Sequence, residues 1–233
     1  MSRSDCAASH SSVAHPAQRI IGLTGGIGMG KTTVSNYLAT AHHLPILDAD
    51  VYAREAVALG SALLGELASR YGSSLLLSNG ELNRVRLGEI VFSSRSELQW
   101  LEQQIHPFVR DRMATELKTL DPCTHPTLVI VIPLLFEVRM TDLVTEIWVV
   151  HCDRTLQVER LRDRALTSPL TLDQIHARID SQMPIAKKIR RAHHRIENND
   201  NLEGLFSQID QALHSCLVPD SIDRLRSGSS SNA

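Results

Sequence analysis

A glycine-rich loop directly after a short apolar segment constrains this fold more than any other feature. The segment Ile20–Thr24 leads into G-G-I-G-M-G-K-T, which matches G-x-x-x-x-G-K-[ST], and a helical pattern follows from Thr33 to Ala41. Glycines let the backbone curl until successive N–H groups face inward at the positive end of a helix. The sequence therefore predicts a phosphate-binding loop between a strand and a helix. The loop residues are Gly25, Gly26, Ile27, Gly28, Met29, Gly30, Lys31, Thr32 and Thr33.

Two side chains of this loop have predicted roles of their own. Lys31 can reach the β- and γ-phosphates of a nucleotide, and the Thr32 hydroxyl can ligate Mg²⁺. A dinucleotide-binding site would need a third glycine where Lys31 stands. A GTPase would need an Asp followed by Gly three residues later and an Asn-Lys pair, and the chain has neither. The loop therefore predicts an enzyme that uses ATP and Mg²⁺.

Short apolar segments alternate with longer segments of helical period, which is typical of a parallel sheet covered by helices. After the first strand, Arg19 to Thr24, the predicted strands are Pro45–Leu47, Leu128–Ile132 and Ile147–Val150. About eighty residues separate the second strand from the third, which is too long for an ordinary crossover helix. Most of that interval, from Val51 to about Leu120, has a helical pattern. We therefore expect one α/β domain with a helical substrate-binding insertion.

This division assigns every part of the chain. The ends are polar and rich in Ser, and we expect them to be disordered. The expected parts are a disordered extension at 1–18, a core at 19–50 and 121–225, an insertion at about 51–120, and a disordered tail at 226–233.

Two carboxylates follow the second predicted strand, in Asp48-Ala49-Asp50. Because side chains alternate along a strand, Asp48 and Asp50 are expected to point the same way. Ligands of an open parallel sheet bind at the carboxyl ends of its strands, where the phosphate loop also lies. One carboxylate could accept a proton from an attacking hydroxyl while the other orients it or contacts metal-bound water. The alternative is a helix N-cap, a role that suits Asp50.

The third and fourth predicted strands lack the terminal Asp or Asp-Glu that supplies a metal ligand in motor-type ATPases. This favours a small-molecule kinase over a mechanical ATPase. Pro133-Leu134-Leu135-Phe136-Glu137 follows the third strand instead. Glu137 fits either a site residue or the solvated start of a helix, and its spacing does not decide between them.

Positive charge is concentrated near the C-terminus. Residues 154–195 contain ten basic and four acidic side chains, a net charge of +6, while the other residues contain 14 basic and 22 acidic ones, a net charge of −8. Gln157, Arg160 and Arg164 fall on one face of a predicted helix, and Arg178 and Gln182 are four residues apart. A solvated helical face is one interpretation. A transferring phosphoryl group also needs cations that close over it, so we expect a lid at about 154–192, with Arg160 and Arg164 as its catalytic residues.

Composition excludes several other classes of protein. The net charge is −2 and the pI is about 6.6, which disfavours a globally basic nucleic-acid binder. The longest apolar stretch, from Leu128 to Phe136, is far shorter than the ~20 residues of a membrane-spanning helix. The four cysteines form no C-x-x-C pair, and the first residues lack the apolar core of a secretory signal. We therefore expect a cytoplasmic protein with no nucleic-acid or membrane partner.

An ordered series of short motifs resembles the dephospho-coenzyme A kinase family over about residues 19–200. It implies a three-layer P-loop kinase with a mostly parallel sheet, a helical CoA-binding insertion and a helical lid. It also implies transfer of the γ-phosphoryl group of ATP to the ribose 3′-hydroxyl of dephospho-CoA, the last step of coenzyme A synthesis. The matching residues are Leu23 to Val34, Asp48 to Asp50, Gly80, Leu82, Arg84, Phe92, Leu101-Glu102, His106-Pro107, Pro133 to Glu137, Gln157, Arg160-Leu161, Arg164, Arg178, Ser181-Gln182 and Asn198.

Carried over by position, the resemblance implies that Asp50 is the general base and Asp48 a supporting residue. Arg84 and His106 resemble positions that shape the acceptor site, although His106 also fits a helix-end histidine before Pro107. Met29 departs from the family, which usually has a small Ser or Ala there. Because the loop binds phosphate through the backbone N–H at that position and not through the side chain, we expect Met29 to be tolerated. The alternatives are a P-loop kinase for another small alcohol or nucleotide, and a nucleotide-binding regulatory module.

Overall fold

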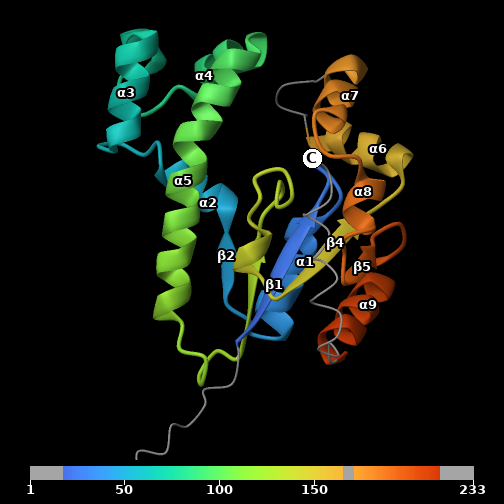
Figure 1. Cartoon of the computed structure of the whole chain (residues 1–233). Helices are drawn as coiled ribbons and strands as arrows, with labels where there is room; N and C mark the ends of the chain where they lie inside the picture. Colours follow the sequence, from blue (N-terminus) through green and yellow to red (C-terminus); the bar gives the residue numbers. More distant parts are fainter. Residues whose placement is uncertain (1–17, 165–170, 216–233) are drawn as a thin grey trace, which may run out of the picture.

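A computed structural model describes residues 18–164 and 171–215, apart from the side chains of residues 92 and 164. Its centre is a five-stranded sheet in the order β2-β3-β1-β4-β5, and all of its neighbouring strands are parallel (Figure 1). The predicted ends at 1–18 and 226–233 lie outside the described residues except for Gln18. The strands are β1 Arg19–Gly25, β2 Ile46–Asp48, β3 Thr127–Val131, β4 Glu146–His151 and β5 His194–Glu197.

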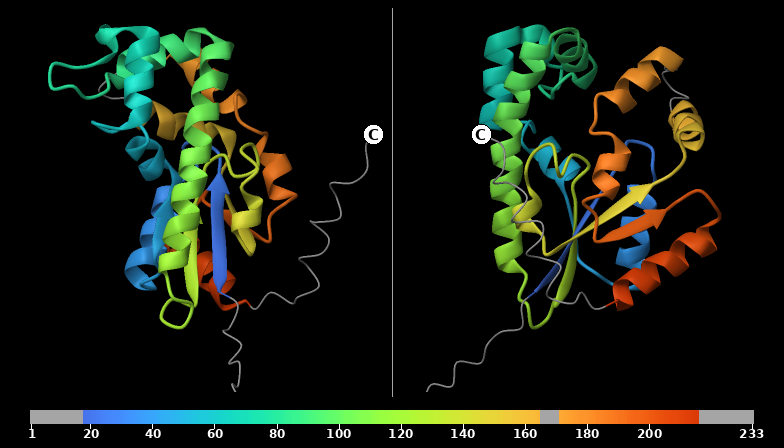
Figure 2. Two further views of the ribbon diagram at one scale, coloured as in Figure 1. Left: turned by 60° about the vertical axis from the view of Figure 1, so that its left-hand side comes forward. Right: turned by 45° about the vertical axis from the view of Figure 1, so that its right-hand side comes forward.

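Helices cover both faces of the sheet (Figure 2). Because each parallel connection must return the chain to the same end of the sheet, α-helices lie between successive strands, except from β3 to β4, where the connection has only the 3-10 helix Thr141–Leu143. The helices are α1 Lys31–Ala41, α2 Ala49–Glu55, α3 Ala62–Tyr71, α4 Arg84–Ser93, α5 Arg95–Thr119, α6 Arg154–Arg164, α7 Leu172–Asp180, α8 Ile185–Ile189 and α9 Leu202–His214.

Strand β3 shows how the sheet divides the core into two layers. Leu128 and Ile130 pack on one face with residues of α2 and α5, whereas Val129 and Val131 pack on the other face with residues of α1 and α9. All four side chains are 5% exposed or less. This alternation explains why the sequence shows continuous apolar runs, since strands buried on both faces need apolar side chains at every position.

The inserted helices have a small hydrophobic core of their own. Leu64 and Leu67 of α3 pack there with Leu87 of α4 and Leu101 of α5. Further along α5, Val109 and Met113 pack against the main core. The long helix α5 therefore joins the insertion to the sheet and fixes its position above the carboxyl ends of the strands (Figure 1).

The prediction of an α/β fold with a parallel sheet and a helical insertion is confirmed. The four predicted strands are present, with bounds that differ by about one residue at either end. Strand β5 is missing from the prediction, because only Ile196 of its four residues is buried and apolar. The sequence of this edge strand therefore lacks the apolar run from which the other strands are predicted.

Helices α6, α7 and α8 stand on the opposite side of the carboxyl edge from the insertion (Figure 2). The space between these two groups of helices faces the end of β1, where the phosphate loop begins. Among the residues that the structure describes, no helix is long and apolar enough to cross a membrane.

Candidate active site

The glycine-rich loop runs from the end of β1 to the start of α1, as its sequence predicts. Gly30 is the N-cap of α1 and has a left-handed backbone conformation, with φ of 99°. A Cβ atom there would lie 2.1 Å from Asn198 Nδ2, so both the backbone conformation and the space require glycine. The loop N–H groups therefore lie at the positive end of α1, where an anion is stabilised.

Three amide side chains from outside the loop hold its backbone in place. Gln157 Nε2 donates to Ile27 O (2.7 Å), and the N–H of Ile27 donates to Gln182 Oε1 (2.9 Å). Asn198 Nδ2 donates to Met29 O (3.0 Å). Gln157 and Asn198 are buried, at 2% and 5% exposure. The loop shape therefore depends on α6, on the residues after α7 and on the residues after β5, as well as on its own glycines.

Met29 uses its side chain inside the loop. Its Sδ atom accepts a hydrogen bond from the N–H of Gly26 (3.2 Å), and the side chain is 3% exposed. A Cβ atom on Gly26 would lie 2.8 Å from this sulfur. The unusual methionine therefore fills the space beside Gly26.

Lys31 folds back over the loop. Its Nζ atom donates to Gly25 O (3.1 Å) and Gly26 O (2.9 Å). These carbonyls orient the ammonium group toward the inside of the loop, where an incoming phosphate would lie.

Asp48 and Asp50 do not lie on one strand, so the expectation that alternation points them the same way is wrong. Strand β2 ends at Asp48, and the chain then enters α2. Asp48 is the N-cap of this helix and accepts a hydrogen bond at Oδ1 from the N–H of Asp50 (2.9 Å). The capping role that the sequence suggested for Asp50 therefore belongs to Asp48. Burial raises the pKa of the Asp48 carboxyl, partly offset by its hydrogen bond from the Asp50 backbone.

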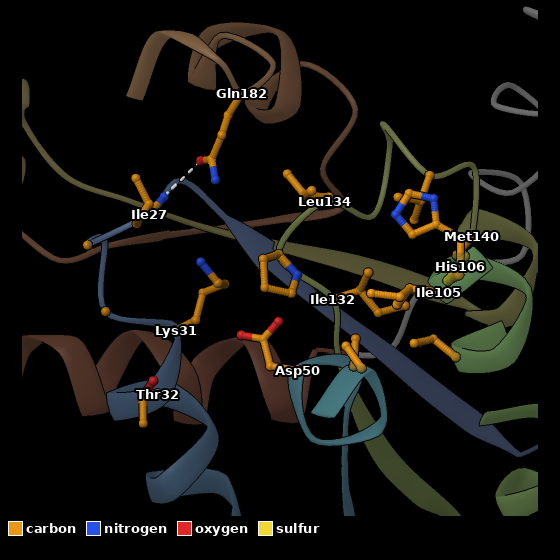
Figure 3. A pocket seen from close by; sticks show the side chains of 17 residues that line it. Ile27, Lys31, Thr32, Asp50, Ile105, His106, Ile132, Leu134, Met140 and Gln182 are labelled. Atoms are coloured by element: carbon orange, nitrogen blue, oxygen red, sulfur yellow. Dashed lines mark hydrogen bonds between the residues drawn. The ribbon is translucent and has the colours of Figure 1, made fainter. Parts of the chain in front are cut away.

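Asp50 occupies the first turn of α2, and its side chain is exposed to a cavity. In Figure 3 its carboxylate points into the space below Lys31 and the loop. The cap at Asp48 fixes the start of α2, so the two carboxylates have different roles. Asp48 positions the helix, and Asp50 faces the cavity.

The cavity has a volume of about 420 Å³ and lies between the loop, α2, α5 and the chain that follows β3 (Figure 3). One wall is polar and the other is largely apolar. The lining residues are Ile27, Gly28, Gly30, Lys31, Thr32, Ala49, Asp50, Ala53, Ile105, His106, Val109, Ile132, Pro133, Leu134, Val138, Met140 and Gln182.

His106 enters the cavity from the middle of α5, next to Ile105 and Val109. It is not at a helix end, because α5 continues through Pro107 to Thr119. Burial lowers the pKa of the His106 imidazole, which favours its neutral form. A neutral imidazole in an apolar wall can donate or accept a hydrogen bond without adding charge.

The predicted site residues separate into two groups. Seven of them line the cavity, namely Ile27, Gly28, Gly30, Lys31, Thr32, Asp50 and His106. Gly25, Gly26, Met29, Thr33 and Asp48 lie outside the lining and support the loop or the start of α2. Arg84 is exposed at the first position of α4 and does not line the cavity.

The two predicted lid arginines are on α6, and Arg160 does not line the cavity in this structure. Arg160 lies beside Asn198, with 3.4 Å between Nη2 and Oδ1, and its Nη1 atom is buried without a hydrogen-bond partner among the described residues. Its charge partly offsets the burial that raises the pKa of the Cys152 thiol. Arg164 is the last residue of α6, and its side chain lies outside the described part of the chain. Their predicted roles remain predictions.

Glu137 pairs with a buried lysine and lies in a turn, so it is not the solvated start of a helix, and its role as a site residue stays a prediction. Its Oε1 atom lies 2.9 Å from Nζ of Lys188, whose side chain is fully buried. Lys188 Nζ also donates to Pro133 O (3.0 Å). No spacing rule joins Glu137 to Lys188, because they are far apart in the chain. Gln182 and Asn198 belong to the motif series, but nothing in the sequence assigns them to the loop.

Thr32 is the residue available for Mg²⁺. Its hydroxyl is exposed at the cavity, close to Lys31 in the chain (Figure 3). The described residues contain no cluster of three or more His, Cys, Asp or Glu side chains that could hold a metal by themselves. A magnesium ion here fits the pattern in which a few protein oxygens are completed by substrate phosphates and water.

Comparison with known proteins agrees with this geometry. The chain is 56% identical over 197 residues to a dephospho-CoA kinase of Trichormus variabilis, covering 84% of this chain and 97% of that protein. It is 53% identical to a dephospho-CoA kinase of Nostoc sp., again covering 84% of this chain and 97% of that protein. A solved structure of dephospho-CoA kinase from Campylobacter jejuni is 25% identical, with a TM-score of 0.63 over 83% of this chain and 94% of that one. Residues 19–204 match the family model for dephospho-CoA kinase, and the chain therefore belongs to the dephospho-CoA kinase family.

Proposed function

We propose that this chain transfers the γ-phosphoryl group of ATP to the ribose 3′-hydroxyl of dephospho-CoA, which completes coenzyme A. The observation that carries this proposal is that Lys31, Thr32 and Asp50 line one cavity from two different elements. The P-loop provides a site for the phosphate donor, and Asp50 provides a carboxylate for the acceptor. Family membership supplies the identity of both substrates.

The proposed step is an in-line displacement at the γ-phosphorus. The 3′-hydroxyl oxygen attacks, and a new oxygen–phosphorus bond forms. The bond from the γ-phosphorus to the bridging oxygen breaks, and its electron pair stays on ADP. Asp50 accepts the proton of the hydroxyl, because its exposed carboxylate faces the cavity.

The P-loop side stabilises charge in this step. Its backbone N–H groups and the ammonium of Lys31 bind the β- and γ-phosphates. When bound at the hydroxyl of Thr32, Mg²⁺ would neutralise part of the phosphate charge. Arg160 and Arg164 are candidates for further positive charge, provided by a lid at about residues 154–192.

The acceptor side is assigned to the helical insertion at about residues 51–120. Ile105 and Val109 give the cavity an apolar wall, and the neutral His106 can form a hydrogen bond within it. Asp48 supports the site by capping α2, and Arg84 is a further candidate for acceptor binding. The near-neutral net charge of −2 and the expected lack of a nucleic-acid partner fit a small-molecule enzyme of the cytoplasm.

Replacing Asp50 by Asn tests the proposal. The amide keeps the shape of the side chain but cannot accept the proton, so kcat should fall by about a hundredfold to ten-thousandfold. ATP affinity, measured by calorimetry, should change little because the P-loop is intact. Asp111→Asn, at an exposed position of α5, is the matched control and should keep full activity. Undiminished turnover of dephospho-CoA by Asp50→Asn would remove Asp50 from the role of base.

An acceptor panel distinguishes the proposed function from its alternatives. ADP release is measured with dephospho-CoA, nucleoside monophosphates and a small alcohol such as shikimate. A strong preference for dephospho-CoA supports the proposal, and a preference for another acceptor indicates a different kinase. A protein that binds ATP but releases no ADP with any acceptor would be a regulatory module.

A further inference from the structure

Gln182 has a position that the proposed mechanism does not yet use. It lies between α7 and α8, and it lines both the cavity described above and a second cavity of about 440 Å³ on the other side of the loop. No other described residue lines both cavities. The side chain of Gln182 is therefore part of the wall between them, next to the P-loop.

The orientation of the Gln182 carboxamide is fixed by its bond to Ile27. The backbone N–H of Ile27 can only donate, so the amide oxygen of Gln182 must face it, at 2.9 Å. The amide nitrogen is then the opposite end of the group. In Figure 3 this nitrogen points into the cavity, above Lys31. Gln157 Nε2 donates to the carbonyl of the same residue, Ile27, which keeps its peptide groups in place.

The backbone beside Gln182 is also fixed. The N–H of the next residue, Met183, donates to Glu137 Oε1 (3.0 Å). That oxygen also pairs with the fully buried Lys188, which bonds to the carbonyl of Pro133 in the cavity wall. Gln182 is thus held at its side chain by the P-loop and at its main chain by the chain that follows β3. A donor placed in advance of the reaction stabilises charge without the cost of reorganisation.

We propose that Gln182 is a catalytic residue whose Nε2 atom donates a hydrogen bond to the phosphoryl group during its transfer. The role rests on the proposed function, because it requires a phosphoryl group between Lys31 and Asp50. Negative charge spreads over the three equatorial oxygens of the transferring group, and each can accept a hydrogen bond. A neutral amide provides such a donor beside the P-loop. Gln182 takes no part in bond making or proton transfer.

The other use of this contact would be a latch. In that case Gln182 Oε1 would occupy an N–H group that the nucleotide needs, and releasing it would be required for ATP to bind. The two roles predict different effects of removing the side chain on kcat and on ATP binding. Loss of a donor lowers kcat, whereas loss of a latch tightens ATP binding and leaves kcat unchanged.

The test is Gln182→Met, which keeps the length and neutrality of the side chain and removes both donors. The thioether still offers a weak acceptor to Ile27, as Met29 Sδ does to Gly26. We expect kcat to fall by about a hundredfold, as for the loss of one preorganised donor, with a much smaller change in the KM for ATP. Gln211→Met on α9 is the matched control and should keep full activity, because α9 lies away from the cavity (Figure 1).

A binding measurement separates the catalytic role from a structural one. Aluminium fluoride with ADP and dephospho-CoA mimics the transferring phosphoryl group, and transition-state mimics bind more tightly than substrates. The unaltered protein should bind ADP more tightly when fluoride and acceptor are present, and Gln182→Met should lose most of that gain while binding ADP alone normally. Thermal unfolding of both proteins shows that the variant is folded.

The possible outcomes are distinct. An unchanged kcat with an unchanged gain from fluoride overturns the role of Gln182, and tighter ATP binding with an unchanged kcat would identify a latch instead. A lack of transfer to dephospho-CoA by the unaltered protein would refute the proposed function, and the role of Gln182 with it. Activity in the unaltered protein together with full activity in Gln182→Met would refute only the role of Gln182.

Discussion

Charged side chains gather at both ends of the sheet, but their surroundings differ. At the amino end, Glu146 is fully buried and its Oε1 atom accepts from Arg19 Nε (2.9 Å) and Trp148 Nε1 (3.0 Å). The same arginine also donates to the last carbonyls of α9. At the carboxyl end, Lys31 and Asp50 line a cavity, and Asp50 is exposed.

The difference shows that residue type alone does not identify an active site. Both ends contain a carboxylate and a cation, but at the amino end they pair directly with one another, and the carboxylate is fully buried. The Arg19 guanidinium is already bonded to Glu146 and to two carbonyls of α9, and the Glu146 carboxylate has no access to solvent, which leaves little capacity for a ligand. Groups that face a cavity can exchange water for substrate. Changes at the amino end should therefore alter stability, and changes at the carboxyl end should alter catalysis.

Lys31→Ala gives the largest expected effect. The variant loses the charge that binds the β- and γ-phosphates, so kcat/KM for ATP should fall by about a thousandfold, equivalent to about 4 kcal/mol. Both steady-state kinetics and direct nucleotide binding should show the loss. Lys118→Ala, at an exposed position near the end of α5, is the matched control. Normal kinetics of Lys31→Ala would refute the assignment of the P-loop.

Sequence could predict the carboxyl end in part because the P-loop is local. Its function depends on consecutive residues, so one motif contains nearly all of the residues that would bind the phosphate donor. The strand–loop–helix order and the cavity position of Asp50 also follow from where strands end. The predicted alternation of Asp48 and Asp50 along one strand is wrong, since β2 ends at Asp48 and α2 begins at the next residue.

The remaining features depend on contacts between distant parts of the chain. Gln157 and Gln182 are far from Ile27 in the sequence. Only folding brings their side-chain amides to the backbone of Ile27. Glu137 and Lys188 meet in the same way. Strand β5 has no clear signal in the sequence because an edge strand needs few apolar residues. Neither hydrophobic periodicity nor the spacing of residues in a motif predicts contacts between residues that are distant in the chain.

Glu146→Gln tests the amino end and should have a smaller effect, on stability. The amide can still accept from Arg19 and Trp148, but it leaves the guanidinium without its buried counter-charge. The free energy of unfolding should fall by about 3 kcal/mol, as for the loss of one partner from a buried ion pair. Urea unfolding measures the change, and kcat at neutral pH should stay near that of the unaltered protein.

The control for this prediction is an exposed pair. Arg86 and Glu89 on α4 form an ion pair at 2.9 Å with both side chains more than half exposed. Glu89→Gln should cost no more than about 0.5 kcal/mol, because water screens such pairs. A large loss of kcat in Glu146→Gln, with stability unchanged, would contradict the division between the two ends.

His193 gives the smallest expected effect, which appears only as a pH dependence. Its Nδ1 atom accepts from the N–H of Ile147 (2.9 Å), so the ring must be unprotonated there. Burial lowers the pKa of His193, and also that of His194, below the ordinary value of 6.5. A lowered pKa means that the folded state binds fewer protons than the unfolded state. The resulting stabilisation is present above about pH 6.5 and is lost as the pH falls through the folded-state value.

His193→Gln should therefore reduce the pH dependence of unfolding. Glutamine can still accept from Ile147 but does not titrate near neutral pH. The free energy of unfolding of the unaltered protein should fall from pH 7.5 to 5.5, and the variant should fall less, by on the order of 0.5 kcal/mol because the half-buried ring is partly screened. Equal slopes would show that His193 is not responsible. A changed kcat at pH 7.5 would instead connect this end of the sheet to catalysis, because a residue that only stabilises the fold leaves the rate of the folded enzyme unaltered.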